Sequence, residues 1–383
     1  MPSELARHFA LDPEVVFLNH GSFGACPRAV LEKQSELRAR MEREPVLFLA
    51  RELEKLFDHA RGELGAFVGA DPDDLAFVKN ASTGVSTVVR SLDLRAGDEL
   101  LTTSHAYNAC HNALRAQERR GVKVVAAEVP FPIRSPAQVV ESIVAHATPR
   151  TRLALIDHVT SPTGLIFPVA EIVRALEERG IDSLVDGAHV PGMIPLDIDA
   201  LSPAYYTGNC HKWLCTPKGC AFLWVRRDRQ DAILPLTISH GYNSLRTDRS
   251  RFRLLFDGQG TDDPTAVLCL GDSIRFLESL LPGGFQELMR RNHGLALEGR
   301  AAICAALGIP EPAPESMIGT LATVPLPDGP AEPLQRALWE KRRIEVPVWT
   351  FPAWPRRILR VAAQIYNSIE DYRALAAALP SLL

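Results

Sequence analysis

The chain has 383 residues, of which 46% are hydrophobic and 23% charged, and its formal net charge is −4. This balance is typical of a globular protein of two or three domains, and the lack of a basic excess argues against nucleic acid as a partner. No apolar run approaches the roughly 18 uncharged residues of a membrane helix. The charged N-terminal segment lacks the apolar core of a signal peptide, so we expect a cytoplasmic protein without membrane contact.

Two amphipathic helices are predicted early in the chain, over residues 28–44 and 47–68, where apolar residues recur at three- and four-residue steps. Short β-branched or aromatic runs then alternate with helical stretches. The runs are LAFVKN, DELLTTS, VKVVAAEV, RLALIDHV, DSLVDGAH, AYYTGN and CAFLWVR. Such alternation predicts a mostly parallel sheet flanked by helices on both faces, which is an α/β fold.

The pattern changes after this region to two helices and then to short strands in GTLATVPL, IEVPVWT and RILRVAAQIY, followed by a final helix. This mixture predicts a smaller α+β domain. We therefore expect an N-terminal arm over residues 1–25 that packs on the small domain and the site's mouth. A large domain is expected over 26–265 and a small C-terminal domain over 266–383.

Seven cysteines occur, an odd number, and none forms a CxxC pair. This usage fits a reducing compartment better than a disulfide framework. One group of potential metal ligands consists of Cys210, His211, Cys215 and Cys220. Their spacing is too wide for a zinc site and no second pair follows at a suitable distance, so we expect no metal centre.

Polar residues follow five of the predicted strands. They lie in ASTGVS, in HAYN, in TSPTG, in the segment that carries Asp186 and His189, and at His211 and Lys212. Any one of them has a structural explanation, because Ser and Thr cap helices and Asp closes turns. Ligands of open α/β sheets bind at the carboxyl ends of the strands, so five such ends together favour one site.

Lys212 is unusual because the surrounding sequence, YYTGNCHKWLCTPKGCAFLWV, is apolar and rich in cysteine. A lysine in an apolar slot has a lowered pKa, which frees its lone pair to form a Schiff base. Asp186, on the preceding predicted strand, would keep a pyridine nitrogen protonated. The ASTG segment at a helix N-terminus would bind a phosphate. These features together predict pyridoxal phosphate as the cofactor.

Several segments resemble the class V aminotransferase family, and within it the isopenicillin N epimerase-like branch. They are FLNHGSFGACP, VDGAHVPGMIPLDIDAL, YYTGNCHKWLCTPKGCAFLWV, SHGY, and IEVPV with RVAAQIYN. The similarity extends from about Phe17 to Asn367, and DGAH followed by HKW and PKG is its most specific part. It implies a fold-type I pyridoxal-phosphate enzyme that forms a homodimer with active sites at the subunit interface.

The resemblance also implies roles for single residues. Lys212 would bind the cofactor covalently and Asp186 would pair with its ring nitrogen. His189 would lie near the phenolic oxygen of the ring, and His105, in preference to Tyr107, would stack on the ring face.

Further implied roles concern the phosphate and the substrate. The phosphate would be surrounded by Ser82, Thr83, Asn209 and His211, and Thr261 would reach the phosphate of the neighbouring subunit. Arg360 would bind the substrate carboxylate, because an arginine fork matches a carboxylate. Asn19 and His20 would line the substrate mouth, and the candidates for an acid–base group opposite Lys212 are His20, Tyr107 and Tyr242. Relatives often carry a basic residue where this chain has Asp262, which leaves the substrate open.

Structural alternatives accompany some of these assignments. Arg360 would otherwise be an ordinary surface arginine, and His105 a solvated residue at a strand end. Trp213 is expected to serve packing. Trp349 and nearby aromatic residues would either belong to the core or form the pocket wall.

Several reactions can follow once the Cα–H bond of the substrate is weakened. The resemblance favours epimerisation, with β-elimination by a C–S lyase or cysteine desulfhydrase and transamination as alternatives. Persulfide transfer needs a mobile cysteine before the strand of Arg360, and no cysteine follows Ala305. A binding protein that keeps the fold without turnover is the alternative outside enzyme chemistry.

Overall fold

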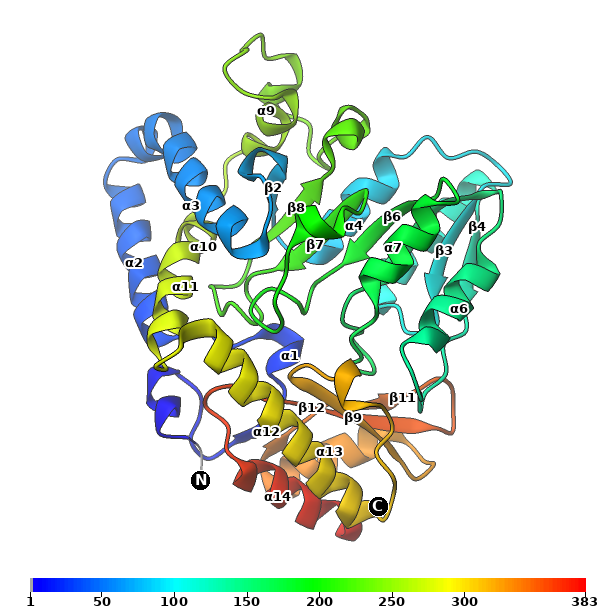
Figure 1. The fold of residues 1–383 in the computed structure, drawn as a ribbon. Helices are drawn as coiled ribbons and strands as arrows, with labels where there is room; N and C mark the ends of the chain where they lie inside the picture. The colour runs from blue at the N-terminus through cyan, green and yellow to red at the C-terminus, as the bar shows by residue number, and fades with distance from the viewer. Residues whose placement is uncertain (1–2) are drawn as a thin grey trace.

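A computed structural model describes residues 3–383 of the chain (Figure 1). Its central sheet has the strand order β2-β8-β7-β6-β5-β3-β4. The strands are β2 (Leu75–Val78), β3 (Glu99–Thr103), β4 (Lys123–Ala127), β5 (Thr151–Asp157), β6 (Asp182–Asp186), β7 (Tyr205–Asn209) and β8 (Ala221–Val225). Strands β4, β3, β5, β6 and β7 are parallel, and β8 is antiparallel to both of its neighbours. The prediction of a mixed, mostly parallel sheet is confirmed, and each predicted run contains one strand.

Helices cover both faces of this sheet. Alternate residues of β5 divide between two apolar clusters, because successive side chains of a strand point to opposite faces. Leu153 and Leu155 belong to the cluster that contains α4 (Ala81–Ser91) and α5 (Asn108–Arg115). The other face packs against α6 and α7, whose bounds are Ala137–His146 and Val169–Glu177. Burial on both faces explains why the strands are near-continuous apolar runs.

A second, three-stranded antiparallel sheet has the order β11-β12-β9. Its strands are β9 (Leu321–Leu326), β11 (Val348–Thr350) and β12 (Arg357–Ala362). The helices that accompany it are α12 (Gly284–Leu307), α13 (Ala331–Arg342) and α14 (Ile369–Ala378). Figure 1 shows this part below the large sheet, with α1 (His20–Phe23) near the boundary between them.

The N-terminal segment is attached to the C-terminal part by a short parallel pair of β1 (Val16–Phe17) and β10 (Ile344–Glu345). The first predicted helix is α2 (Arg28–Arg43). The second begins with an irregular π-helical turn and continues as α3 (Leu53–Val68). The remaining helices are α8 (Ile198–Leu201), α9 (Arg251–Asp257), α10 (Thr265–Leu268) and α11 (Leu270–Ser279).

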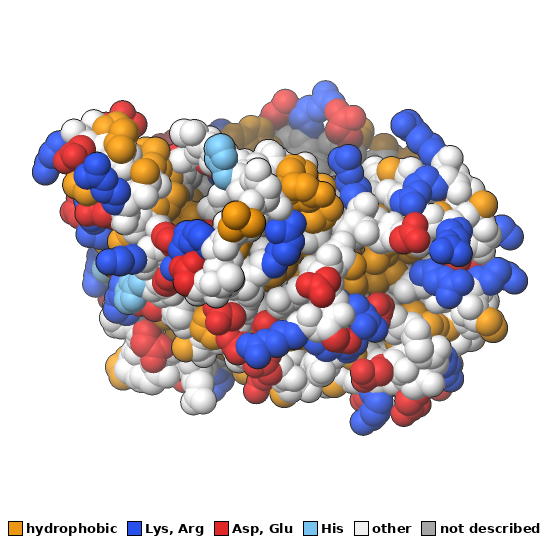
Figure 2. Space-filling model, turned by 90° about the horizontal axis from the view of Figure 1, so that it is seen from above, with side chains coloured by type: hydrophobic (Ala, Val, Ile, Leu, Met, Phe, Trp, Pro, Cys, Tyr) orange, Lys and Arg blue, Asp and Glu red, His pale blue; other side chains and the backbone are white. Residues whose placement is uncertain are grey.

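The surface carries charges of both signs. Figure 2 shows positive and negative side chains intermingled over the face seen from above. Among residues 3–383, none of the helices has the length and apolar character needed to cross a bilayer. The same residues contain no group of three or more His, Cys, Asp or Glu side chains placed to hold a metal ion.

Candidate active site

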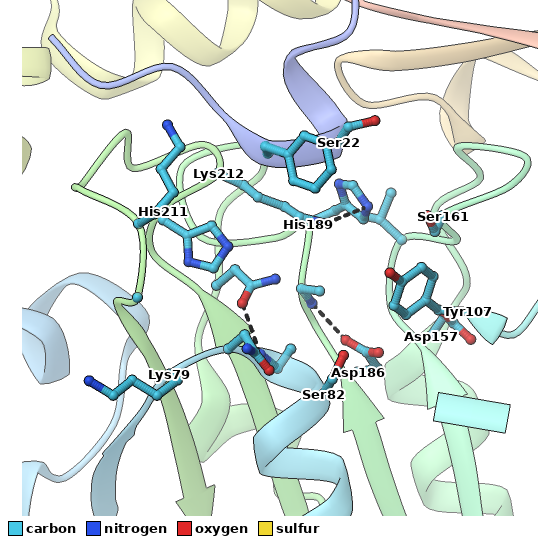
Figure 3. A pocket seen from close by; sticks show the side chains of 18 residues that line it. Ser22, Lys79, Ser82, Tyr107, Asp157, Ser161, Asp186, His189, His211 and Lys212 are labelled. Atoms are coloured by element: carbon cyan, nitrogen blue, oxygen red, sulfur yellow. Dashed lines mark hydrogen bonds between the residues drawn. The ribbon is translucent and has the colours of Figure 1, made fainter. Parts of the chain in front are cut away.

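A cavity of about 360 Å³ lies at the carboxyl ends of β5, β6 and β7 (Figure 3). Its wall is formed by the loops after β3, β5, β6 and β7, the N-terminus of α4 and part of α1. Parallel strands joined by helical crossovers place their loops and helix N-termini at this edge of the sheet. The polar strand ends of the sequence therefore meet in one place.

Lys212 lies in the cavity wall, in the loop after β7. Its Nζ is 3.1 Å from Nε2 of His189, which follows β6. The surrounding protein lowers the pKa of Lys212 to about 7, chiefly through burial and also through the positive charge of Arg360. At neutral pH a large fraction of this amine is therefore unprotonated and able to act as a nucleophile or a base.

Asp186 is the last residue of β6 and is 3% exposed. Its carboxylate accepts hydrogen bonds from the backbone N–H of Ala188 at 2.9 Å and from the thiol of Cys110 at 3.2 Å. Burial raises the pKa of Asp186, and the positive charge of Lys212 opposes this rise. Within the described part of the chain this carboxylate has no ion-pair partner, so a protonated ring nitrogen would supply the cation that it lacks.

The part of the cavity wall formed by the start of α4 and the end of β7 is suited to an anion. The chain enters α4 through Asn80, whose side chain accepts the backbone N–H of Thr83 at 2.8 Å. The backbone N–H of Ala81 donates to Oδ1 of Asn209 at 2.9 Å, which joins the helix start to the end of β7. Ser82, on the first turn of α4, lines the cavity. A helix N-terminus with a hydroxyl favours a phosphate by its dipole and its N–H groups.

His211 lies on the same side and lines the cavity. Its Nδ1–H donates to the carbonyl of Cys220 at 3.0 Å, and burial lowers its pKa to about 4. Lys79 and Lys218 also line the cavity and add positive charge to its wall. Thr83 does not line the cavity, because its hydroxyl is bonded to Asn80 at 3.0 Å. It acts as part of the helix cap.

An amine, an unpaired buried carboxylate and a helix N-terminus thus surround one cavity, and this set fits pyridoxal phosphate. The sequence profile of the aminotransferase class V family matches residues 17–346. The chain belongs to this family. It is accordingly a pyridoxal-phosphate-dependent enzyme, which confirms the predicted family and cofactor.

Curated relatives span nearly the whole chain. Isopenicillin N epimerase of Streptomyces clavuligerus is 35% identical, covering 99% of this chain and 98% of the relative. A probable chloroplastic L-cysteine desulfhydrase of Arabidopsis thaliana is 29% identical, covering 100% of this chain and 85% of the relative. Among solved structures, the cystine C–S lyase C-DES in complex with cysteine persulfide has a TM-score of 0.80 at 22% identity, covering 96% of this chain and 97% of that one. This last likeness establishes the fold.

The structure distinguishes His105 from Tyr107. His105 is 0% exposed and both of its ring nitrogens are bonded, Nδ1 to the hydroxyl of Thr163 at 2.7 Å and Nε2 to the carbonyl of Val129 at 3.0 Å. It does not line the cavity, whereas Tyr107 does. Figure 3 shows the Tyr107 ring beside Asp157 and near Asp186. The stacking role stays a prediction, and this arrangement favours Tyr107 over His105 because His105 is already engaged by the protein.

His20 is also buried and lies outside the cavity wall. Its Nε2–H donates to the backbone carbonyl of Lys212 at 2.9 Å, and its Nδ1 accepts the hydroxyl of Tyr366 at 2.8 Å. Asn19 is held by Glu345 at 3.0 Å and by Ser22 at 2.6 Å. His20 therefore anchors the lysine loop and Asn19 anchors α1, and the roles of both residues at the substrate mouth stay predictions.

Arg360 is not a surface arginine, because it lies on β12 and is 2% exposed. It donates to the backbone carbonyl of Ser161, which lines the cavity. Its guanidinium lies 4.9 Å from the ring centroid of Trp349. Burial lowers the pKa of Arg360 to about 10, so it remains charged at neutral pH. In the described residues it has no acidic partner, and its role in binding a substrate carboxylate stays a prediction.

Two further predicted residues lie apart from the cavity wall. Tyr242 is 51% exposed and packs against Arg251, 5.4 Å from its guanidinium carbon. Thr261 is exposed in the segment between α9 and α10, and its role across a subunit interface stays a prediction. The neighbouring Asp262 forms an ion pair with Lys79 of the cavity rim, so this acidic substitution contacts the site indirectly.

Some residues of the cavity were not predicted from the sequence. Asp157, the last residue of β5, lines it together with Ser22 and Phe23, whereas Ser161 belongs to the TSPTG segment that was expected at the site. The rule that identified Asp186, a carboxylate at the end of a buried strand, applies equally to Asp157. Ser22 and Phe23 belong to α1, which lies in the N-terminal arm expected at the site's mouth, but no pattern in the sequence singles out these two side chains.

Proposed function

We propose that the protein moves the Cα proton of an amino acid or an amino-acid-derived substrate in the manner of an epimerase. The observation that carries this proposal is the amine of Lys212, held at a pKa of about 7 in a cavity that Arg360 borders through Ser161. Relatives named isopenicillin N epimerase, at 35% and 36% identity, support it.

Pyridoxal phosphate, when bound, withdraws electrons from an attached amino acid and makes its Cα–H acidic. The residues of the chain would provide the rest. Asp186 would hold the ring nitrogen, and the N-terminus of α4 with Ser82 would bind the phosphate. Arg360 would bind the substrate carboxylate and so orient the Cα–H toward Lys212. The lysine amine would then accept the proton, since its pKa lies near the working pH.

Epimerisation requires a proton to be delivered to the other face of Cα. Of the three candidates for this role, Tyr107 lines the cavity, while His20 is occupied by two hydrogen bonds and Tyr242 lies on an exposed segment. We assign the second acid–base role to Tyr107. Tyrosine hydroxyls are among the side-chain groups that act as general acids and bases.

β-Elimination is the alternative, because it needs only a base such as Lys212 and a leaving group on the substrate. L-Cysteine desulfhydrases of plants, at 27–29% identity over nearly the whole chain, favour it. Persulfide transfer lacks support, since all seven cysteines are buried and none of them lines the cavity. A catalytic cysteine needs a partially exposed position.

Incubation of the holoenzyme with a panel of amino acids in heavy water tests the proposal. Deuterium at Cα without release of ammonia is expected for an epimerase, and inversion would be followed by chiral chromatography. Ammonia with pyruvate or sulfide would instead assign elimination, and a keto acid would assign transamination. If the holoenzyme exchanges no Cα proton with any member of the panel, the proposal is wrong. Lys212→Ala is the negative control.

We also propose that the enzyme is a homodimer in which Thr261 reaches the partner's cavity. The segment between β8 and α9 exposes apolar side chains, namely Leu234, Leu236, Ile238, Tyr242 and Leu245. Phe23, at the cavity, is 74% exposed. Exposed apolar groups of this size support a protein interface.

Co-expression of Lys212→Ala with Thr261→Ala chains tests this arrangement. Each variant alone should be impaired. In a mixed dimer with shared sites, one site carries both changes and the other carries neither, so activity should return. Absence of recovery in mixed dimers, or a monomeric mass by light scattering, would contradict the shared site.

A further inference from the structure

Trp213 follows Lys212 directly in the chain and is fully buried, with 0% exposure. Its indole Nε1–H donates to Nδ1 of His189 at 3.4 Å. On the other side of the same imidazole, Nε2 lies 3.1 Å from Nζ of Lys212 (Figure 3). His189 therefore connects the indole of Trp213 to the amine of the preceding residue.

The chemistry of the three groups determines where the proton of His189 lies. An indole nitrogen only donates, so Nδ1 of His189 must accept and carries no proton. A neutral imidazole then carries its proton on Nε2, which faces Lys212. His189 is neutral because burial, followed by the positive charges of Lys212 and Arg360, lowers its pKa well below the usual range.

We propose that Trp213 is a positioning residue that fixes His189 in the Nε2–H tautomer, so that the imidazole presents a donor to the Lys212 amine. The inference deepens the proposed function, since it concerns the reactivity of that lysine. An ammonium group has no lone pair to accept such a hydrogen bond, whereas a neutral amine has one. The tautomer therefore favours the unprotonated, reactive form of Lys212.

The opposite tautomer is disfavoured by burial. It would direct two N–H groups at each other, and His189 is 1% exposed while Trp213 is fully buried. A buried donor without an acceptor is costly, because water cannot replace the partner. The indole is also held in place, since its ring centroid lies 4.8 Å from that of His20. A Cβ at Gly192 would lie 2.6 Å from the Trp213 carbonyl, so the backbone is closely packed as well.

Other charged and titratable groups act on the pair from each neighbouring element. Arg360 on β12 and Asp186 on β6 influence Lys212 in opposite directions, and Cys110 on α5 acts with Asp186. His20 and His211 act on His189. These groups are common to the wild type and the variants below, so a change in pH dependence between the proteins reports on the indole.

Trp213→Phe removes the N–H and keeps an aromatic ring. In this variant, Nε2 of His189 is free to accept from the ammonium form of Lys212, which favours the protonated lysine. The pH midpoint for capture of pyridoxal phosphate by the cofactor-stripped enzyme should therefore move up by about one unit, equivalent to one hydrogen bond. Trp224→Phe is the matched control, because the buried Nε1 of Trp224 has no partner among the described residues, and it should leave the midpoint unchanged.

A second background separates tautomer control from packing. A glutamine amide has no tautomers and can donate a hydrogen bond to Lys212 whether or not the indole N–H is present. In a His189→Gln enzyme, Trp213→Phe should therefore produce no further shift in the pH midpoint for cofactor capture. An equal shift in both backgrounds, or an equal shift in Trp224→Phe, would overturn the inference.

Nitrogen NMR of the histidine-labelled, cofactor-stripped enzyme reads the tautomer directly, with the His189 signal assigned by its loss in His189→Gln. The wild type should be protonated at Nε2, and a proton at Nδ1 would overturn the inference even if Trp213→Phe does not fold. If the protein bound no cofactor, the proposed function would fail, whereas the tautomer of His189 would still be measured on the protein alone.

Discussion

Asp157 and Asp186 are partners in register at the ends of β5 and β6, and both residues line the same cavity. Each is 3% exposed. Burial raises the pKa of Asp157 well above its usual range, and the charge of Asp186 raises it further. Hydrogen bonds and the charge of Lys212 oppose the rise for Asp186, so we assign the negative charge to Asp186 and the proton to Asp157.

The first prediction concerns Asp157→Asn, an uncharged isostere. The folded protein holds a proton on Asp157 at a pH where the unfolded chain has released it, so stability falls as pH rises above about 4, the ordinary pKa of the carboxyl. The variant should lack this decrease. In urea unfolding of the cofactor-free protein at pH 8, its free energy of unfolding should exceed that of the wild type by roughly 1 kcal/mol or more.

The dissociation constant of Asp157→Asn for pyridoxal phosphate should lie within about threefold of the wild-type value, because the side chain at position 157 is uncharged in both proteins. Asp186→Asn should weaken binding by about 100-fold or more, since it removes the partner of a buried cation. Equal losses in the two variants would show that the charge is not divided as proposed.

The second prediction concerns the pH dependence of cofactor capture. The pKa of Lys212 is lowered to about 7 by burial first and by Arg360 second. Only the unprotonated amine attacks an aldehyde, so the capture rate should rise with pH through about 7 and then level. Stopped-flow absorbance of the cofactor measures this rate. Lys123→Ala, on the exposed start of β4, should behave as the wild type, and a midpoint near 10 would contradict the burial of Lys212.

The third prediction tests the anchoring of the lysine loop. Tyr366→Phe removes the hydroxyl bonded to His20, which itself holds the carbonyl of Lys212. We expect a loss of about 1 kcal/mol in the free energy of unfolding and faster dissociation of the cofactor. The matched control is Tyr372→Phe, which removes a buried hydroxyl bonded to the carbonyl of Ala362 at 2.8 Å. It should cost similar stability without affecting the cofactor.

The fourth prediction concerns Arg360→Leu. Loss of a charge-assisted bond to the substrate carboxylate should raise KM for amino acids by about 30-fold. Amines of the same shape without a carboxylate should not show this rise in KM. Arg356→Leu, four residues earlier and exposed, is the control. If KM rises equally in both variants, or for both classes of substrate, Arg360 does not bind the carboxylate.

The sequence predicted the sheet well because its strands are buried on both faces and read as apolar runs. Four residues predicted for the site line one cavity, because they lie at strand or helix ends that the topology must bring together: Asp186, His189, Lys212 and Ser82.

Residues in loops were harder to assign. His105 and Tyr107 are two positions apart, and the path of the loop alone decides which of them reaches the cavity. The hydrogen bonds of His105 to Thr163 and Val129 join segments far apart in the chain, and no local pattern reveals them. The same holds for His20, whose partner Tyr366 lies near the other end of the chain.

The central claim is that Lys212 is the residue that binds pyridoxal phosphate covalently. Borohydride converts a C=N bond to a stable C–N bond, so reduction of the holoenzyme followed by peptide mass spectrometry locates the attachment. We predict the mass of the reduced cofactor on the peptide that contains Lys212 and its absence in Lys212→Ala. A cofactor mass on another lysine, or an unmodified Lys212 in an active holoenzyme, would contradict the account.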